Sequence, residues 1–192
     1  MYQSIRWKSA DLELLPDNGN RYEIIDGELI VTRAPHWNHQ RVITKLIRSL
    51  SNWSIQHNLG EVVTTPGLIF TDDDNVIPDL VWISSDRLAR MLDESGHLVG
   101  APELVVEVLS AGSDNERRDS ATRTLREREV KRKLYAIRGV QEYWIVDWHR
   151  QQVEIFRRDS QVLALVATLF ANDVLTSPLL PDFQQPVVEI FS

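Results

Sequence analysis

Short apolar runs with a period of two open the chain and predict antiparallel strands. Residues 22–32 form two such runs, and the dipeptide Asp26-Gly27 between them is typical of a two-residue hairpin turn. A period of three or four begins near Asn38, a suitable N-cap, and continues to residues 58–60. The apolar positions of this segment predict an amphipathic helix: Val42, Ile43, Leu46, Ile47, Leu50 and Trp53.

The next part of the chain carries further strand patterns. Residues 61–70 are rich in Val, Thr and Ile, and a polar turn at residues 72–75 leads into an apolar run at residues 76–83. This arrangement predicts a second hairpin whose return strand carries Asp79. Residues 87–100 are polar and irregular, and a short helix fits part of them.

The remaining segments complete a fold with both helices and strands. Residues 103–109 are almost all apolar, which is typical of a central strand covered on both faces. A rough helical stripe over residues 115–138, ended by Gly139, predicts a long charged helix. Strand patterns follow at residues 142–147 and 152–156, and then a β-rich tail. The sum predicts an α/β (α+β) fold, a mixed β-sheet flanked by helices with extra antiparallel strands at the N- and C-termini.

Length and composition fit one folded domain, residues 1–192. Apolar residues make up 43% of the chain and charged residues 26%, which is close to ordinary globular usage. No apolar run approaches the roughly 20 residues that span a bilayer, and the start of the chain lacks the apolar stretch of a signal peptide. We therefore expect a cytoplasmic protein without a membrane partner.

The charge of the chain is uneven. A net charge of −7 argues against a protein that coats nucleic acid by bulk electrostatics. Residues 114–133 are locally basic, with eight basic and five acidic residues. Two interpretations of this helix stay open. It contacts phosphates, or it carries exposed pairs of Glu and Arg.

Two carboxylates interrupt apolar strands, and they are the strongest chemical signal in the chain. Burying either Asp79 or Glu107 unpaired would be costly. In neighbouring strands the two charges would lie about 5 Å apart and repel by roughly 3 kcal/mol at an effective dielectric near 20, which a divalent cation would relieve. Cysteine is absent, so oxygen ligands or the five histidines must hold a metal, and this favours Mg²⁺ or Mn²⁺. The alternative makes Asp79 a turn residue and Glu107 the partner of an arginine.

A hairpin that ends in Pro78-Asp79, followed by an apolar strand bearing Glu107, resembles the PD-(D/E)xK nuclease superfamily. Leu109 stands where that motif has its lysine, so the motif is incomplete along the strand. Four segments together resemble one branch, the Uma-two family of restriction-endonuclease-like proteins: residues 22–28, 78–81, 102–110 and 139–147. In that family a Lys-x-x-x-Tyr pattern on the following helix supplies the lysine, which implies roles for Lys131 and Tyr135.

Several further residues are candidates for the same site. Three cations on the helix compete with Lys131, namely Arg128, Arg132 and Lys133, but Arg128, Lys131 and Tyr135 share one helical face. A solvated lysine is the alternative for Lys131. His39 occupies a position where the family often has histidine, although capping or surface histidines are common there. An N-terminal acid joins the metal shell in related nucleases, which makes Glu23 and Glu28 additional candidates.

The resemblance implies a Mg²⁺-dependent (or Mn²⁺-dependent) endonuclease that hydrolyses DNA and works as a homodimer, because cutting both strands needs two active sites. Asp79 and Glu107 would hold the ion, and Lys131 would be catalytic; no binding residues for another cofactor are predicted. One alternative is a catalytically silent module that keeps the nuclease fold and binds nucleic acid or protein. Another is a hydrolase of a different phosphodiester. No separate DNA-reading module is evident, so the sequence predicts no cleavage specificity.

Overall fold

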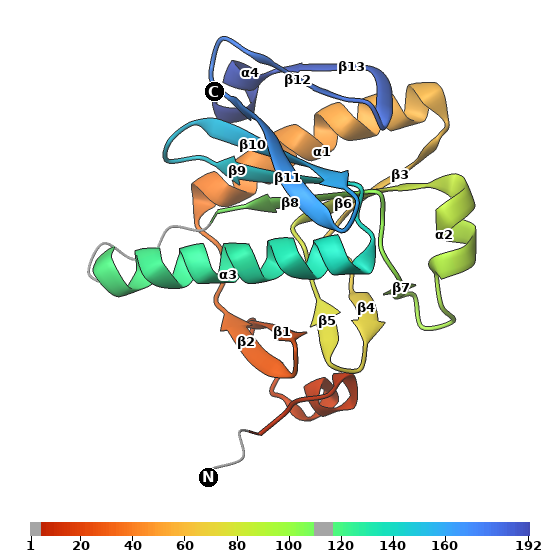
Figure 1. Ribbon diagram of the computed structural model, residues 1–192, viewed down its shortest axis with the longest axis vertical. Coiled ribbons are helices and arrows are strands. Elements are labelled where there is room, and N and C mark those ends of the chain that lie inside the picture. Colours follow the sequence, from red (N-terminus) through yellow and green to blue (C-terminus); the bar gives the residue numbers. More distant parts are fainter. Residues whose placement is uncertain (1–4, 110–116) are drawn as a thin grey trace.

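Two β-sheets organise the protein (Figure 1). The computed structural model describes residues 5–109 and 117–192, with the side chains of residues 117–125 outside the description. The first sheet has five strands in the order β2-β1-β5-β4-β7. Their bounds are Arg21–Ile25 (β1), Glu28–Thr32 (β2), Leu68–Thr71 (β4), Asp74–Val76 (β5) and Leu98–Val99 (β7).

The second sheet has six strands in the order β11-β10-β9-β8-β6-β3. Strands β8 and β9 are parallel, and the other neighbours are antiparallel. Parallel neighbours need a crossover connection, which here contains the helix α3 (Arg117–Arg138). The strand bounds are Gly60–Thr64 (β3), Leu80–Ser84 (β6), Leu104–Val108 (β8), Glu142–Asp147 (β9), Gln152–Asp159 (β10) and Val162–Leu169 (β11).

Helices cover both faces of the six-stranded sheet. Helix α1 (Trp37–His57) lies on one face, and α3 lies on the other, between the two sheets (Figure 1). A C-terminal hairpin and a short helix cover α1 from outside. The remaining elements are η1 (Ser9–Leu14, a 3₁₀ helix), α2 (Ser85–Met91), β12 (Val174–Ser177), β13 (Leu180–Pro186) and α4 (Val187–Phe191).

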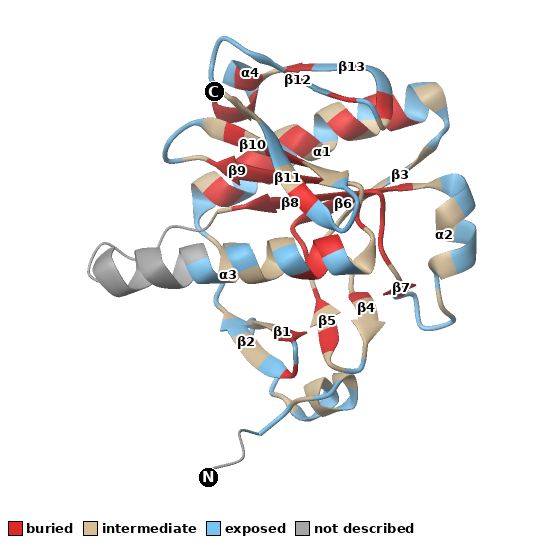
Figure 2. Ribbon diagram, viewed as in Figure 1, coloured by how far each residue is buried: buried red, intermediate tan, exposed pale blue. Residues whose placement is uncertain are grey.

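The six-stranded sheet separates two apolar clusters. Alternate residues of a strand point to opposite faces, so Val106 of β8 packs in the cluster with α1, and Val105 packs in the cluster with α3. All five residues of β8 are buried, and Figure 2 shows the same for β9. The predicted central strand covered on both faces is thereby confirmed. Burial on both sides also means that a charged residue in β8 must find its partners inside the protein.

Most of the predicted elements form, with small differences at their ends. The first hairpin turns at Asp26 and Gly27, whose positive φ angles of 49° and 69° suit a two-residue turn. The predicted N-cap of α1 is wrong. His36 caps the helix because its side chain accepts a hydrogen bond from the backbone N–H of Asn38. Among the described helices, none combines the length and apolar character needed to cross a membrane.

The second predicted hairpin is broken, and this correction decides where Asp79 lies. One arm is interrupted at residues 65–67 and the other at residues 77–79, so β3 pairs with β6 in one sheet and β4 pairs with β5 in the other. Each interruption contains a proline, Pro66 or Pro78, which cannot donate a backbone hydrogen bond. Asp79 therefore lies in the break, one residue before β6, where the two sheets meet.

Candidate active site

Asp79, one residue before β6, lies opposite Glu107 of β8. Strands β6 and β8 pair with Leu80 opposite Val106 and Val81 opposite Val105. Extending this antiparallel register by one residue sets Asp79 opposite Glu107, and directly opposed side chains have Cβ atoms about 5 Å apart. Both residues are buried. The predicted convergence of two acids that are distant in the sequence is therefore present in the fold.

Asp79 is held by donors from three different elements. Its Oδ1 accepts a hydrogen bond from the Arg21 guanidinium at 3.1 Å, and its Oδ2 accepts one from the backbone N–H of Val108 at 2.9 Å. The Nε2 of His39 lies 3.2 Å from the same Oδ2. Burial acts to raise the pKa of Asp79, but His39, Val108 and Arg21 outweigh it, so the pKa lies below its ordinary value. Asp79 is thus kept as an anion.

Glu107 shares the ammonium of Lys131 with a second acid, Glu23. The Nζ of Lys131 lies 3.0 Å from Glu107 Oε1 and 3.0 and 3.2 Å from the two carboxylate oxygens of Glu23. The Tyr135 hydroxyl donates to the same Glu107 oxygen at 2.8 Å. The backbone N–H of Ile77 donates to Glu23 at 2.9 Å, which fixes that acid beside the break in the hairpin.

The pKa values of Glu107 and Lys131 are both raised, although burial acts on the two groups in opposite directions. Burial raises the pKa of Glu107 to about 7, because the attraction of Lys131 is offset by the negative charges of Asp79 and Glu23. Burial acts to lower the pKa of Lys131, but Glu107 and Glu23 raise it well above its ordinary value. Lys131 is therefore a permanent cation between two acids, Glu107 and Glu23.

The structure brings together every sequence-predicted site residue except Glu28. Glu28 is exposed at the start of β2, where it pairs with Ile25, and its side chain makes no hydrogen bond or ion pair within the described ranges. The three rivals of Lys131 lie outside the cluster. Arg128 pairs with Glu154, Arg132 pairs with Glu129, and Lys133 is exposed. The catalytic and metal-binding roles of the gathered residues remain predictions.

Sequence reasoning missed Arg21. Its guanidinium contacts the Asp79 carboxylate, and the side chain is 24% exposed, so it is both a neutralising partner and reachable from solvent. The signal that would have found it is the period of two along β1, because Arg21 and Glu23 point to the same face of that strand.

The oxygen donors of this cluster suit a hard divalent cation. Asp79 and Glu107 offer carboxylate oxygens on adjacent strands, and Glu107 Oε2 accepts no hydrogen bond from the described residues. His39 Nδ1 is buried and has no hydrogen-bond partner within the same ranges. No group of three or more His, Asp or Glu in residues 5–109 and 117–192 has the arrangement of a complete metal site. The donor chemistry fits one ion held by two carboxylates.

The raised pKa of Glu107 predicts a pH-dependent cost to stability. Between its ordinary pKa of 4.5 and its folded pKa of about 7, the unfolded chain releases the proton while the folded chain keeps it. Folding stability should therefore fall as the pH rises through this window, by about 3 kcal/mol in total for the shift. Glu107→Gln removes the titrating group. We expect the free energy of unfolding of this variant to increase relative to that of the wild type as the pH rises from about 5 to about 8.

Urea unfolding at both pH values measures this difference, and Glu61→Gln, an exposed acid on β3, is the matched control. The control should show the same pH dependence as the wild type. A gap between Glu107→Gln and the wild type that stays constant with pH would show that Glu107 ionises at its ordinary pKa.

Comparison with known proteins identifies the family to which the chain belongs. The Uma2 family, described as "Putative restriction endonuclease", matches residues 9–188. No curated protein matches the chain. A solved "putative nuclease belonging to DUF820" from Anabaena variabilis is similar, with a TM-score of 0.68 and 16% identity over 96% of this chain and 97% of that one. The type IIG restriction endonuclease BpuSI gives a TM-score of 0.36 and 17% identity over 80% of this chain and 15% of that one.

The similarity to the Anabaena protein covers nearly the whole of both chains and concerns the fold. It confirms the predicted mixed architecture of sheets flanked by helices. The family match includes both large sheets and the cluster around Lys131. The chain therefore belongs to the Uma2 family, as the four motif segments indicated.

Proposed function

We propose that the protein is an endonuclease that hydrolyses phosphodiester bonds of DNA with Mg²⁺ or Mn²⁺. The observation that carries this proposal is the Lys131 ammonium, held 3.0 Å from Glu107 while Asp79 lies opposite Glu107 on the next strand. Two acids and a permanent cation around one point suit the transfer of a phosphoryl group, whose transition state gains negative charge. Membership of the nuclease-like family supports the same choice.

Each residue of the cluster has a part in this chemistry. Asp79 and Glu107 would hold the ion, which when bound would supply Lewis-acid chemistry to polarise a phosphate oxygen and make water a better nucleophile. Lys131 stabilises the extra negative charge of the transition state and orients the attacking water. Tyr135 and Glu23 hold Glu107 and the Lys131 ammonium in place. Arg21 and His39 do the same for Asp79.

Supercoiled plasmid, single-stranded RNA and a small aryl phosphodiester, each with Mg²⁺ and with EDTA, test the function. We expect cleavage of the plasmid with Mg²⁺ and none with EDTA. Cleavage of the small diester alone would support a hydrolase of another phosphodiester. Absence of cleavage under all conditions would contradict the proposal and favour a catalytically silent module. Two observations favour that alternative, namely the net charge of −7 and the lack of a complete three-ligand group in the described ranges.

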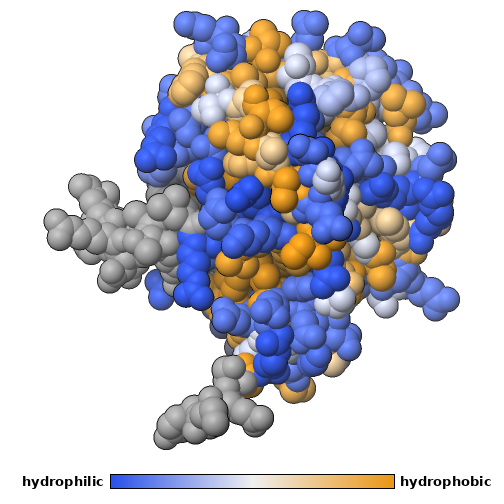
Figure 3. Space-filling model, viewed as in Figure 1, coloured by the Kyte–Doolittle hydropathy of each residue, from blue (hydrophilic) through white to orange (hydrophobic). Residues whose placement is uncertain are grey.

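We propose in addition that the working form is a homodimer, formed through β11. This strand is an edge of the six-stranded sheet, and edge strands offer unpaired backbone groups to another chain. Three apolar residues of β11 are about half exposed, namely Val162, Leu165 and Val166. Figure 3 shows hydrophobic residues gathered over this strand and its neighbours.

A charge on β11 tests the dimer. Leu165→Lys should convert a dimeric wild type into a monomer, because a lysine at a buried interface would be desolvated without a partner. Sedimentation equilibrium measures the mass of both proteins, and Leu59→Lys, an exposed apolar residue after α1, is the control. A wild type that sediments as a monomer, or a Leu165→Lys dimer, would contradict this interface.

A further inference from the structure

Helix α1 carries positive charge without any acid to balance it. The sequence from Thr32 to Leu59 contains no Asp or Glu, although the whole chain has a net charge of −7. Arg41, Lys45 and Arg48 follow one another at intervals of four and three residues, so they share one face of the helix. No acidic partner for Lys45 or Arg48 occurs among the described residues. This face, the α1 basic stripe of Arg41, Lys45 and Arg48, is a suitable track for phosphates.

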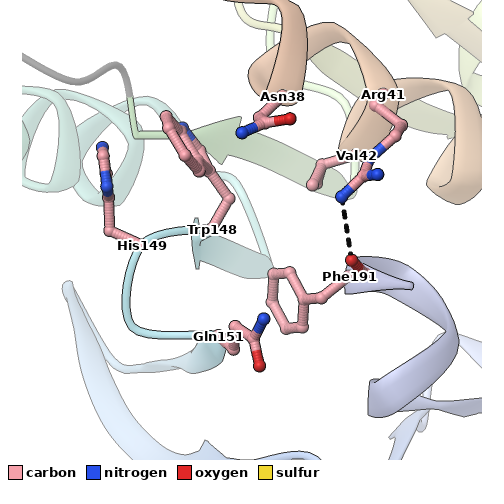
Figure 4. A pocket seen from close by; sticks show the side chains of 7 residues that line it. All are labelled: Asn38, Arg41, Val42, Trp148, His149, Gln151 and Phe191. Carbon is pink, nitrogen blue, oxygen red and sulfur yellow. Dashed lines mark hydrogen bonds between the residues drawn. The ribbon is translucent and has the colours of Figure 1, made fainter.

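A pocket of about 240 Å³ lies at the N-terminal end of this stripe (Figure 4). Three elements line it: the start of α1, the turn between β9 and β10, and the end of α4. Arg41 closes one side and donates a hydrogen bond to the backbone carbonyl of Phe191 at 3.1 Å. Asn38 and Gln151 add amide groups, and the Phe191 ring adds an apolar wall. Amides and a guanidinium beside a ring offer the donors and acceptors that read the edge of a nucleobase.

Aromatic rings are stacked beside the pocket. Trp148 stacks with His36 at 5.0 Å between centroids and an 11° interplanar angle, and with His149 at 3.6 Å and 27°. Asp147 fixes this turn, because its Oδ1 accepts hydrogen bonds from the backbone N–H groups of His149 and Arg150. The column is therefore preformed, and both histidines are exposed. Such a column presents faces on which a further flat ring stacks.

The pocket adjoins the candidate active site at the N-terminal end of α1. Glu107 of β8 pairs with Ile145 of β9, and Trp148 follows three residues later. Glu107 contacts α3, whereas Val42 and Phe191 of the pocket belong to the apolar cluster with α1, so the pocket lies on the other face of the sheet. On α1, Asn38 lines the pocket, and the next residue, His39, contacts Asp79. A nucleic-acid strand that passes around this end of α1 thus reaches both the pocket and Asp79.

We propose that the pocket and the α1 basic stripe together bind a single-stranded stretch of nucleic acid, with an unpaired base in the pocket and its phosphates along Arg41, Lys45 and Arg48. The inference rests on the proposed function for nucleic acid as substrate, and it adds that the strand is unpaired near the site. A basic track combined with a stacking platform is how sequence-tolerant single-strand binding works. In a duplex the bases are paired and stacked, so the pocket cannot take them without melting the helix.

Fluorescence anisotropy in EDTA tests this without any cleavage. The probes are a labelled single strand about 15 nucleotides long, within the site sizes of such modules, its duplex, and an abasic strand of equal length. The wild type should bind the single strand about tenfold more tightly than either other probe, because neither of the other probes can stack an unpaired base in the pocket and one such stack contributes about tenfold in affinity. Trp148→Ala should lose this preference, and Phe170→Ala, an exposed aromatic outside the pocket, should keep it.

Salt dependence tests the stripe. Three phosphate contacts to a single strand give a slope near −2 in a plot of log affinity against log salt, and Lys45→Gln should reduce its size by about 0.7. Lys133→Gln on α3 is the matched control and should leave the slope unchanged. Equal affinity for all three probes, or a slope altered by Lys133→Gln and not by Lys45→Gln, would overturn the inference.

The two proposals fail separately. If the wild type cleaves plasmid with Mg²⁺ but binds the abasic strand as tightly as the normal strand, the proposed nuclease function stands and the proposed binding of a base in the pocket is contradicted. If the wild type prefers the single strand, and loses this preference in Trp148→Ala, but cleaves no substrate, the proposed binding site stands and the proposed nuclease function is contradicted.

Discussion

Asp79→Asn is expected to lose Mg²⁺-dependent DNA cleavage by about a thousandfold, which corresponds to about 4 kcal/mol of the several that a bound metal contributes. Asparagine has the shape of aspartate, and its side-chain oxygen still accepts the hydrogen bond from the Val108 N–H. It lacks the negative charge that both the ion and Arg21 need. The fold should therefore persist while the metal-dependent reaction is lost.

Initial rates of plasmid nicking measure this loss, and circular dichroism checks that the variant is folded. Asp182→Asn, at an exposed acid of β13 with a positive φ of 61° that asparagine also tolerates, is the control and should cleave like the wild type. A folded Asp79→Asn protein with wild-type rates would remove Asp79 from the chemistry.

Lys131→Met is expected to lower the cleavage rate by about 10²- to 10³-fold, the loss typical of a missing group that stabilises transition-state charge. It should also destabilise the fold by about 3–5 kcal/mol, because one partner of a buried ion cluster is removed. Glu107 and Glu23 would then face each other without a cation, and the pKa of Glu107 would rise further.

Lys133→Met is the matched control, since Lys133 lies on the same helix and is exposed. It should change neither the rate nor the free energy of unfolding by much. The double variant Lys131→Met with Glu107→Gln separates the two effects. It should recover stability, because one unpaired charge is gone, and it should stay inactive. Recovery of cleavage by the double variant, or a Lys131→Met protein with wild-type rates, would contradict the role of Lys131.

The elements that could be predicted are those whose residues repeat with a clear period. Helix α1 repeats apolar residues at three and four, and its observed bounds of Trp37–His57 differ from the prediction mainly at the cap. Strand β8 is apolar on both sides, and it is central. The family pattern favours Lys131 over Arg128 and Arg132, and the helical face shared with Tyr135 favours it over Lys133. Lys131 and Tyr135 both contact Glu107, and the catalytic role of Lys131 stays a prediction.

The features that were missed depend on contacts between distant segments. The two arms of the predicted hairpin stop pairing at the same point, at Pro66 in one arm and Pro78 in the other. The sequence of either arm alone does not show that the other arm is interrupted opposite it. Arg21 reaches Asp79 across 58 positions of sequence, and no local pattern announces that contact. The local positive charge of α3 predicts phosphate contacts there, yet Lys131, Arg128 and Arg132 of α3 are engaged in ion pairs.

Calorimetric titration with Mn²⁺ tests most directly whether Asp79 and Glu107 share one ion. The wild type should bind one Mn²⁺ per chain. Asp79→Asn and Glu107→Gln should each weaken this binding by more than about tenfold, because loss of a residue that only supports a metal ligand already weakens affinity by about tenfold or more. A wild type that binds no Mn²⁺, or two variants that bind it as tightly as the wild type, would contradict the account.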